Sequence, residues 1–400
     1  MRRIVLLLAS MALAMLLACG VALALPTGTP DKTPMVNGTV REIEHVGTNI
    51  WLGGKFTQVK QCSDSTNALN VSNLAVIDSE TNRCKNIIAP KLGGTGAEVW
   101  DMTLYGENVL IAGKFSSGSN STQKNLVLVN GKTGDVIRWY NSPSLKSVLA
   151  APELGRIYGG GASLTAFNKD SSTKVWTRAK TTVNTTLYPD APTPGYRDLE
   201  LDGQTIWAAC ACDAVNGKPA KALVKLNTEG SHDDSWRAAP DHAYDASWGM
   251  SVVDVNGALY LGAGGSDYLA EFSKGSGGNP NWVRDTSGSV QVVEVMEGQL
   301  VIGGHFWEVA DKLVDQPPVD MVDKCGHGRS EPDLDPNGKC ETRKGIAAYS
   351  FEGKLDPWSP TYAGKYSLVW ALHVEGSRLH TGGEFLTVNG VTQNYYARLS

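Results

Sequence analysis

The chain has 400 residues, of which 36 are Lys or Arg and 41 are Asp or Glu, so its formal net charge at pH 7 is −5. A mildly acidic chain without a basic cluster lacks the surface that displaces counterions from nucleic acid, which excludes nucleic-acid binding as its main role. Hydrophobic residues make up 42% of the chain, enough to build a packed core, and this excludes intrinsic disorder as the main state. The length fits two or three domains, or one large β domain.

The first 24 residues have the three parts of a secretory signal peptide. Arg2 and Arg3 form a charged start, residues 4–17 are apolar, and residues 22–24 are Ala-Leu-Ala. This order of charged, apolar and small-residue segments predicts cleavage before Leu25. No later stretch approaches the ~18 apolar residues that a membrane-spanning helix needs.

An alternative interpretation of the same segment centres on Cys19. Residues 16–20 are Leu-Leu-Ala-Cys-Gly, which resembles a bacterial lipobox, in which the cysteine is acylated and becomes the mature N-terminus. A third alternative is an uncleaved anchor. All three predict a protein that leaves the cytoplasm, either secreted or associated with the cell envelope, and that touches a membrane only through a lipid or an uncleaved signal.

After the signal, one short pattern recurs seven times: an apolar run that ends in small residues, most often a pair of glycines. The copies lie at residues 49–56, 109–115, 156–161, 205–210, 258–264, 299–306 and 378–385. Each copy is followed by a third β-like run, at residues 74–78, 126–130, 164–168, 223–227, 268–272, 346–350 and 396–400. Five copies then have a fourth run with a tryptophan: Trp139, Trp176, Trp236, Trp282 and Trp358. Short runs separated by Gly, Asn and Asp turns are typical of strands in hairpins.

Four short strands per repeat predict an all-β fold, a seven-bladed β-propeller with four-stranded antiparallel blades, formed by residues 25–400 as a single domain. The last copy ends at Ser400, one strand short of a complete blade, while the segment 25–39 belongs to no blade. We therefore expect this N-terminal segment to supply the missing outer strand and close the ring. The widest departure from the repeat is an insertion in blade six, around 307–345.

Removal of the signal leaves six cysteines, an even number that favours disulfides in an exported chain. Proximity in sequence favours two pairs, Cys62–Cys84 and Cys325–Cys340, the second of which would staple the insertion. Cys210 and Cys212 form either a strained local bridge or two free thiols. Because no C-x-x-C pair is present and the His residues are scattered, the sequence predicts no zinc site.

Certain repeats share a longer signature. Blade seven has Gly-Gly-Glu-Phe at 382–385 and Val-Asn-Gly at 388–390, and blade four keeps Val-Asn-Gly at 215–217, whereas other copies have lost it. In this signature the chain resembles the delta-60 family of bacterial β-propeller repeats, over nearly the whole mature length. The resemblance implies a mostly exported type of propeller, and it implies no particular chemistry.

A second and more distant likeness lies at residues 126–139, LVLVNGKTGDVIRW. This segment resembles the tryptophan-docking repeat of quinoprotein dehydrogenases, a family whose enzymes bind pyrroloquinoline quinone and calcium. Some members have a disulfide between adjacent cysteines. Here Cys210 and Cys212 are separated by one residue and no eighth blade is present, so the likeness is a weak argument for that chemistry.

The insertion contains the first half of a calcium-binding pattern. Asp333, Asp335 and Asn337 alternate and are followed by Gly338, which is the D-x-D-x-N-G start of a calcium loop. The twelfth position is Lys344 in place of a bidentate Glu. The segment is therefore either a weak structural calcium site or an acidic, turn-rich loop, and we expect no other cofactor.

The first strands of the blades contain recurrent polar residues that we expect to face the central channel: Glu42, Asp101, Asp198, Asp254, Glu294 and His373. These residues either hold a cation or polar ligand as a loose ring, or accept hydrogen bonds from neighbouring backbone or water. No spacing singles out two carboxylates for glycoside hydrolysis, and there is no G-x-S-x-G motif, so no catalytic residue is predicted.

These patterns favour a monomeric, non-enzymatic binding or scaffold module at the cell surface or in the extracellular space, with a protein or polysaccharide ligand. Loops that vary in length on a constant frame are typical of recognition surfaces. The alternative is an exported enzyme on the same frame, either quinoprotein-like or a carbohydrate-active hydrolase or lyase.

Overall fold

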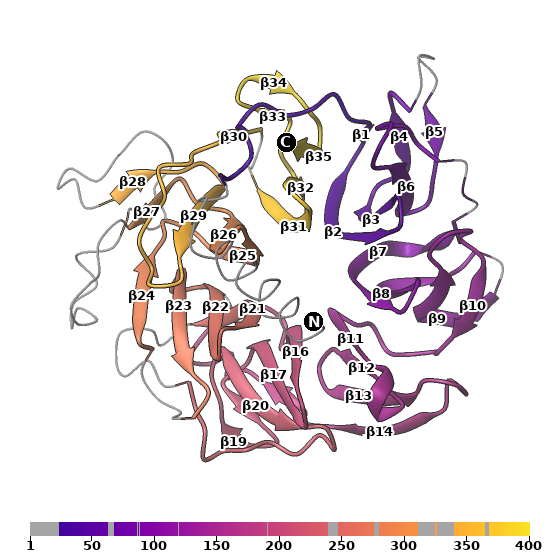
Figure 1. The fold of residues 1–400 in the computed structure, drawn as a ribbon. Helices are drawn as coiled ribbons and strands as arrows, with labels where there is room; N and C mark the ends of the chain where they lie inside the picture. Colours follow the sequence, from indigo (N-terminus) through magenta and orange to yellow (C-terminus); the bar gives the residue numbers. More distant parts are fainter. Residues whose placement is uncertain are drawn as a thin grey trace, which may run out of the picture.

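Seven small sheets stand radially around a central axis and form a ring (Figure 1). The computed structural model describes residues 24–62, 68–85, 87, 89–118, 120–189, 191–238, 247–275, 280–310, 325, 340–364 and 368–400. In each sheet the strands are antiparallel, and the first strand of each repeat lies innermost. The predicted seven-bladed all-β fold is confirmed. Among the described residues, three sheets have the four strands that were predicted; in the other four, three strands are joined at the outer edge by single bridges, Ile77–Cys84, Leu226–His232, Tyr349–Leu355 and Pro30–Leu399.

The blades follow one another in chain order. Blade one contains β2 (Thr39–Val46), β3 (Asn49–Lys55) and β6 (Leu74–Asp78); blade two contains β7 (Leu92–Tyr105), β8 (Asn108–Ser117), β9 (Asn120–Asn130) and β10 (Val136–Trp139). Blade three contains β11 (Ser147–Ala151), η1 (Pro152–Leu154), β12 (Arg156–Gly160), β13 (Leu164–Asn168) and β14 (Lys174–Arg178); blade four contains β16 (Gly195–Asp202), β17 (Thr205–Ala211) and β20 (Leu223–Asn227). Blade five contains β21 (Trp248–Val255), β22 (Ala258–Gly264), β23 (Tyr268–Ser273) and β24 (Trp282–Asp285). Blade six contains β25 (Val290–Met296), β26 (Gln299–Gly304) and β29 (Ile346–Ser350); blade seven contains β31 (Val369–Glu375), β32 (Arg378–Gly383) and β35 (Tyr396–Leu399).

The hydrophobic core is divided among the seams between blades. Seven clusters of buried side chains each join residues of two neighbouring blades; for example, Trp51 and Val76 of blade one pack with Val99 and Ile111 of blade two. Burial between flat sheets rather than inside one globular core explains why every blade needs its neighbour.

Paired glycines allow the blades to approach one another at the end of the second strand. A Cβ added to Gly53 would lie 2.6 Å from Val99 Cγ1 of the next blade, and one added to Gly54 would lie 2.1 Å from the Thr39 carbonyl oxygen of its own blade. One glycine therefore serves the contact between blades and the other serves the contact with the first strand. The recurrence of Gly-Gly in the sequence follows from these two approaches.

The N-terminal segment closes the ring as predicted. Pro30 pairs antiparallel with Leu399, the Thr27 N–H donates to the Ser400 carbonyl at 3.1 Å, and the Asp31 N–H donates to the Arg398 carbonyl at 2.8 Å. The Asp31 carboxylate also pairs with Arg398 Nε at 2.5 Å. The segment is thus the outer strand of blade seven, and the two ends of the chain are joined in one sheet.

Small side sheets extend the loops between second and third strands. They are β1 (Met35–Val36) with β4 (Gln58–Lys60) and β5 (Leu69–Asn70); β15 (Thr181–Thr182) with β18 (Ala214–Val215) and β19 (Lys218–Pro219); β27 (Glu308–Ala310) with β28 (Cys340–Thr342); and β30 (Tyr362–Ala363) with β33 (Thr387–Val388) and β34 (Val391–Thr392). In two of these side sheets a Val-Asn-Gly segment forms the tip, at 215–217 and 388–390, with positive φ at Asn389 (47°) and Gly390 (78°), as a two-residue hairpin turn requires. These tips lie on the face where the first strands begin.

Three disulfide bonds are present, Cys62–Cys84, Cys210–Cys212 and Cys325–Cys340. Cys210 and Cys212, which the sequence left open, are bridged at the end of β17. The signal segment with Cys19, and the calcium-loop residues Asp333, Asp335 and Asn337, lie outside the described residues. Within the described part of the chain, no helix has the length and apolar character to cross a membrane.

Candidate functional site

The first strands of six blades contain a β-bulge at the same place. In blade one the pairing of β2 with β3 shifts between Val40 and Glu42, so Arg41 is the extra residue. The extra residues in the six blades are Arg41, Trp100, Arg197, Met250, Gln291 and Trp370. In blade three, Lys146 stands directly before β11 at the matching position. A bulge redirects a side chain that a regular strand would place elsewhere.

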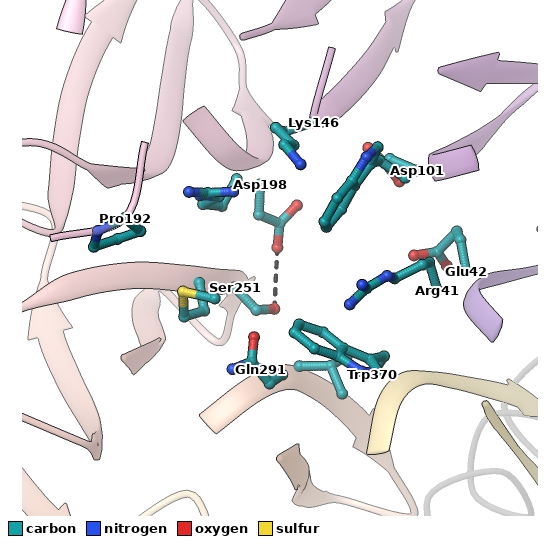
Figure 2. Close-up of a pocket in the computed structure, with 13 residues that line it drawn as sticks. Arg41, Glu42, Asp101, Lys146, Pro192, Asp198, Ser251, Gln291 and Trp370 are labelled. Atoms are coloured by element: carbon teal, nitrogen blue, oxygen red, sulfur yellow. Dashed lines mark hydrogen bonds between the residues drawn. The ribbon is translucent and has the colours of Figure 1, made fainter. Parts of the chain in front are cut away.

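These seven residues line one pocket at the mouth of the central channel (Figure 2). Its volume is about 310 Å³, and its remaining lining residues are Glu42, Asp101, Pro192, Asp198, Ser251 and Val292. Each blade contributes at least one side chain, so the pocket exists only in the closed ring.

Cations and indole rings alternate along one side of the mouth. The Arg41 guanidinium carbon lies 3.9 Å from the Trp370 ring centroid and 4.4 Å from the Trp100 ring centroid. Lys146 Nζ lies 2.8 Å from the Trp100 centroid, and Arg41 Nε pairs with Glu98 at 2.8 Å. Contacts of this kind hold a cation in place without using all of its N–H donors.

Four buried polar atoms of the pocket residues have no hydrogen-bond partner among the described residues: Arg41 Nη1, Arg197 Nε, Gln291 Oε1 and Trp370 Nε1. Leaving such a group unpaired costs about 1–3 kcal/mol. Three of these atoms are donors and one is an acceptor. A polar molecule in the pocket would offer these atoms partners.

The opposite side of the mouth has no charge. Met250 of blade five and Val292 of blade six supply apolar surface there, with Gln291 as the polar group, and Pro192 adds apolar surface next to blade four. The pocket is therefore asymmetric, with cations from blades one, three and four facing an uncharged wall from blades five and six.

The floor of the pocket holds three carboxyl groups, two of which link neighbouring blades. Asp101 accepts a hydrogen bond from the Val148 N–H of blade three at 2.6 Å. Asp198 accepts from the Val252 N–H at 2.9 Å and the Ser251 hydroxyl at 3.0 Å, both in blade five (Figure 2). Glu42 accepts from the N–H of the next residue, Ile43, at 3.0 Å. Each floor carboxyl group thus already accepts at least one hydrogen bond, whereas the side chains at the bulge positions, which form the rim of the pocket, include the unpartnered atoms.

Burial shifts the pKa values of the carboxyl groups at the pocket floor and of Lys146 at its rim. Burial and the nearby Asp101 raise the pKa of Glu42 well above its usual value, and burial together with Asp198 does the same for the pKa of Asp101. Burial also raises the pKa of Asp198. At the rim, burial and the neighbouring Arg197 lower the pKa of Lys146 to about 7. Raised pKa values favour the neutral form of the floor carboxyls, so the charge presented to a ligand is that of the rim cations.

The six predicted channel residues do not form a single ring. Glu42, Asp101 and Asp198 lie at the pocket floor, and Glu294 and His373 lie two residues further along their strands. Asp254 of β21 is paired with Leu259 of β22. Its position along the strand is one residue out of phase with that of Glu294 in blade six, and its carboxylate forms an ion pair with Lys274. Because side chains alternate along a strand, that offset of one residue removes Asp254 from the group.

Sequence reasoning missed two acidic residues at the deeper level, Glu44 and Glu200. Burial raises the pKa of each to about 8 and raises the pKa of Glu294 to about 7. Burial and the neighbouring His380 lower the pKa of His373 to about 4. Burial therefore favours the uncharged forms of Glu44, Glu200 and His373.

The rim residues were also missed, although the sequence contained a signal for them. In three blades a cation or Trp directly precedes the channel acid, as Arg41-Glu42, Trp100-Asp101 and Arg197-Asp198. A shared bulge would have made both members of each doublet candidates. Among the described residues, no group of three or more His, Cys, Asp or Glu is placed to hold a metal ion.

Comparison with known proteins supports the fold. The chain is similar to the WD40 β-propeller domain of Doa1, with a TM-score of 0.52 and 9% identity, over 94% of this chain and 96% of that chain. It is also similar to the computationally designed Ika8 protein, with a TM-score of 0.49 and 9% identity, over 91% of this chain and 98% of that chain. No protein-family model and no curated protein matches the chain, so the delta-60 resemblance stays a prediction.

At such low identity the likeness to Doa1 shows the fold alone: the protein is a β-propeller. In this chain the mouth of the channel is lined by three cations and two indole rings.

Proposed function

We propose that this protein is an exported binding module, a propeller of the delta-60 type, that binds a small anionic ligand at the mouth of its channel. The observation that carries the proposal is the pair of guanidinium groups with unpartnered nitrogens, Arg41 Nη1 and Arg197 Nε, at the rim of one pocket. Anions satisfy such donors with charge-assisted hydrogen bonds, which are about twice as strong as neutral ones.

The Arg41 side chain is already held in one position in the ligand-free protein. Arg41 is stacked against Trp100 and Trp370 and tied at Nε to Glu98, so little side-chain entropy remains to be lost on binding. The floor carboxyls oppose an anion least when they are protonated, which their raised pKa values favour.

Export is supported by the three disulfide bonds, which persist in oxidising compartments, and by the charged, apolar and small-residue order of the first 24 residues. A binding role is supported over catalysis by the engagement of Asp101 and Asp198 with backbone N–H groups of the next blade.

Calorimetric titration of the mature chain with acetate and with inorganic phosphate tests the proposal. We expect saturable binding at low ionic strength, weakened about tenfold or more by Arg197→Gln, since one charge-assisted hydrogen bond is worth about 1.5–3 kcal/mol. Arg178→Gln is the matched control, because Arg178 is an exposed cation on the outer strand of blade three. The absence of saturable binding of either anion, or an equal loss in both variants, would contradict the proposal.

A further inference from the structure

To give every unpartnered polar atom of the pocket a hydrogen-bond partner, one ligand must have both acceptor and donor groups. Arg41 Nη1, Arg197 Nε and Trp370 Nε1 are donors and need acceptors, whereas Gln291 Oε1 is an acceptor and needs a donor. A carboxylate or phosphate oxygen satisfies the donors but cannot satisfy Gln291. The ligand therefore has an anionic end and, apart from it, a neutral donor such as a hydroxyl group.

The uncharged side of the pocket indicates the chemistry of the part of the ligand that is not anionic. Met250 and Val292 of blades five and six offer apolar contact next to Gln291, whereas the cations come from blades one, three and four. A body with C–H surface on one side and hydroxyl groups at its edge matches this wall. At about 310 Å³ the pocket is at the small end of the ~300–1,000 Å³ typical of ligand sites, which limits the ligand to one small ring or its equivalent.

The indole rings argue against a flat aromatic body. Trp100 is contacted by both Arg41 and Lys146, and Trp370 by Arg41, so the cations already engage the π surfaces on which a nucleobase or aryl group would stack. Trp370 instead offers its free N–H to an acceptor.

The rim favours a planar anion. Arg41 and Arg197 each present an unpartnered nitrogen of a flat guanidinium group, and such groups match the in-plane lone pairs of a carboxylate. Carboxylate oxygens offer about four lone-pair sites, enough for both arginines and Lys146 together.

We infer that the ligand is a sugar acid of monosaccharide size, either free or at the end of a chain, for which a hexuronate is the simplest model. This inference rests on the proposed function, because it names the class of anion that the channel mouth binds. The carboxylate lies among Arg41, Lys146 and Arg197, a ring hydroxyl donates to Gln291 Oε1, and the C–H face of the ring lies on Met250 and Val292.

The test compares four probes on the intact, disulfide-bonded mature chain by calorimetry: D-glucuronate, D-glucose, acetate and D-glucose 6-phosphate. We expect D-glucuronate to bind at least tenfold more tightly than each of the others. Gln291→Leu should reduce the ratio of glucuronate to acetate affinity by about tenfold, the size of one hydrogen bond to a buried acceptor. Arg178→Gln should leave that ratio unchanged.

The outcomes separate the two proposals. If acetate binds as tightly as D-glucuronate, the sugar-acid inference is wrong while the anion site stands. If D-glucose 6-phosphate binds more tightly than D-glucuronate, the ligand is a sugar phosphate and the inference is again overturned. If D-glucose equals D-glucuronate, or no probe binds, both proposals fail. If Gln291→Leu lowers both affinities equally and the protein stays folded by circular dichroism, the assigned hydroxyl contact is wrong.

Discussion

The guanidinium group of Arg41, from the first blade, lies 3.9 Å from the ring centroid of Trp370, from the last blade. The two residues meet because the first strands of blades seven and one, β31 and β2, pack against each other where the ring closes. The rim of the proposed binding site thus depends on the same seam that closes the ring.

The pairing of the N-terminal segment with β35, which we call the clasp, provides a first prediction. Asp31→Asn removes the ion pair with Arg398, whose side chain is only 8% exposed, and should lower the free energy of unfolding by about 1–3 kcal/mol in urea. Lys132→Gln is the control, because its pair with Glu107 is exposed (58% and 75%) and worth about 0–1 kcal/mol. Equal losses in the two variants would mean that the clasp is not a site of special stability.

The close approach of blades one and two gives a second prediction. Gly53→Ala places a methyl group 2.6 Å from Val99 Cγ1 and 3.2 Å from Met102, inside a buried seam. Overpacking of this kind costs typically about 1–3 kcal/mol, which the midpoint of urea unfolding measures. Gly275→Ala is the matched substitution, since an added Cβ meets nothing within 4 Å there. If both variants unfold at the wild-type midpoint, the seam is more adaptable than its geometry indicates.

The deeper channel gives a third prediction, which concerns pH. Burial raises the pKa of Glu200 to about 8, whereas in the unfolded chain it ionises near 4.5. The folded state therefore holds a proton that the unfolded state has released, and this group costs stability as pH rises from 4.5 to 8. Glu200→Gln mimics the protonated form, so it should stabilise the protein by roughly 1–4 kcal/mol at pH 8 relative to its effect at pH 5.

Urea unfolding at the two pH values measures that difference. Glu107→Gln, on a side chain that is 75% exposed, is the control and should show little difference between pH 5 and pH 8. A Glu200→Gln variant whose stabilisation is the same at both pH values would mean that Glu200 is ionised in the folded protein throughout.

Lys146 gives a fourth prediction, on anion binding. Burial and Arg197 lower the pKa of Lys146 to about 7, so its charge is lost as pH rises through 7. Anion affinity should then fall severalfold between pH 6 and pH 8, because one of three cations becomes neutral. The floor carboxyls Glu42, Asp101 and Asp198 would add to the fall if they release protons in the same interval.

Calorimetric titration with acetate at pH 6, 7 and 8 measures the profile. Lys146→Gln should weaken binding at pH 6 and flatten the dependence on pH, while any part contributed by the floor carboxyls remains. Lys132→Gln, at an exposed site away from the pocket, should keep the wild-type profile. An unchanged slope in Lys146→Gln would assign the whole pH dependence to the carboxyls.

The amino-acid pattern alone was enough to predict much of the fold. Seven copies of an apolar run with small residues, each followed by further β-like runs, predict seven blades, because the hydrogen-bonding and burial needs of a strand are local and repeat with the sequence. The missing strand at Ser400 and the unassigned segment before Thr39 together predict the closure that Pro30 and Leu399 make. The approaches that require Gly53 and Gly54 likewise leave a recurrent trace in the sequence.

The site itself was decided by tertiary structure. Arg41, Lys146, Arg197 and Trp370 are far apart in the chain, and only ring closure with a bulge in most first strands brings them to one mouth. A bulge adds one residue and turns a side chain toward the channel. Asp254 lies four residues after the bulge residue Met250 of its blade, whereas Glu294 and His373 lie three residues after Gln291 and Trp370, so Asp254 is one residue out of phase with them. The charges of Glu42 and Lys146 depend on burial and on neighbours from other blades, which no local pattern specifies.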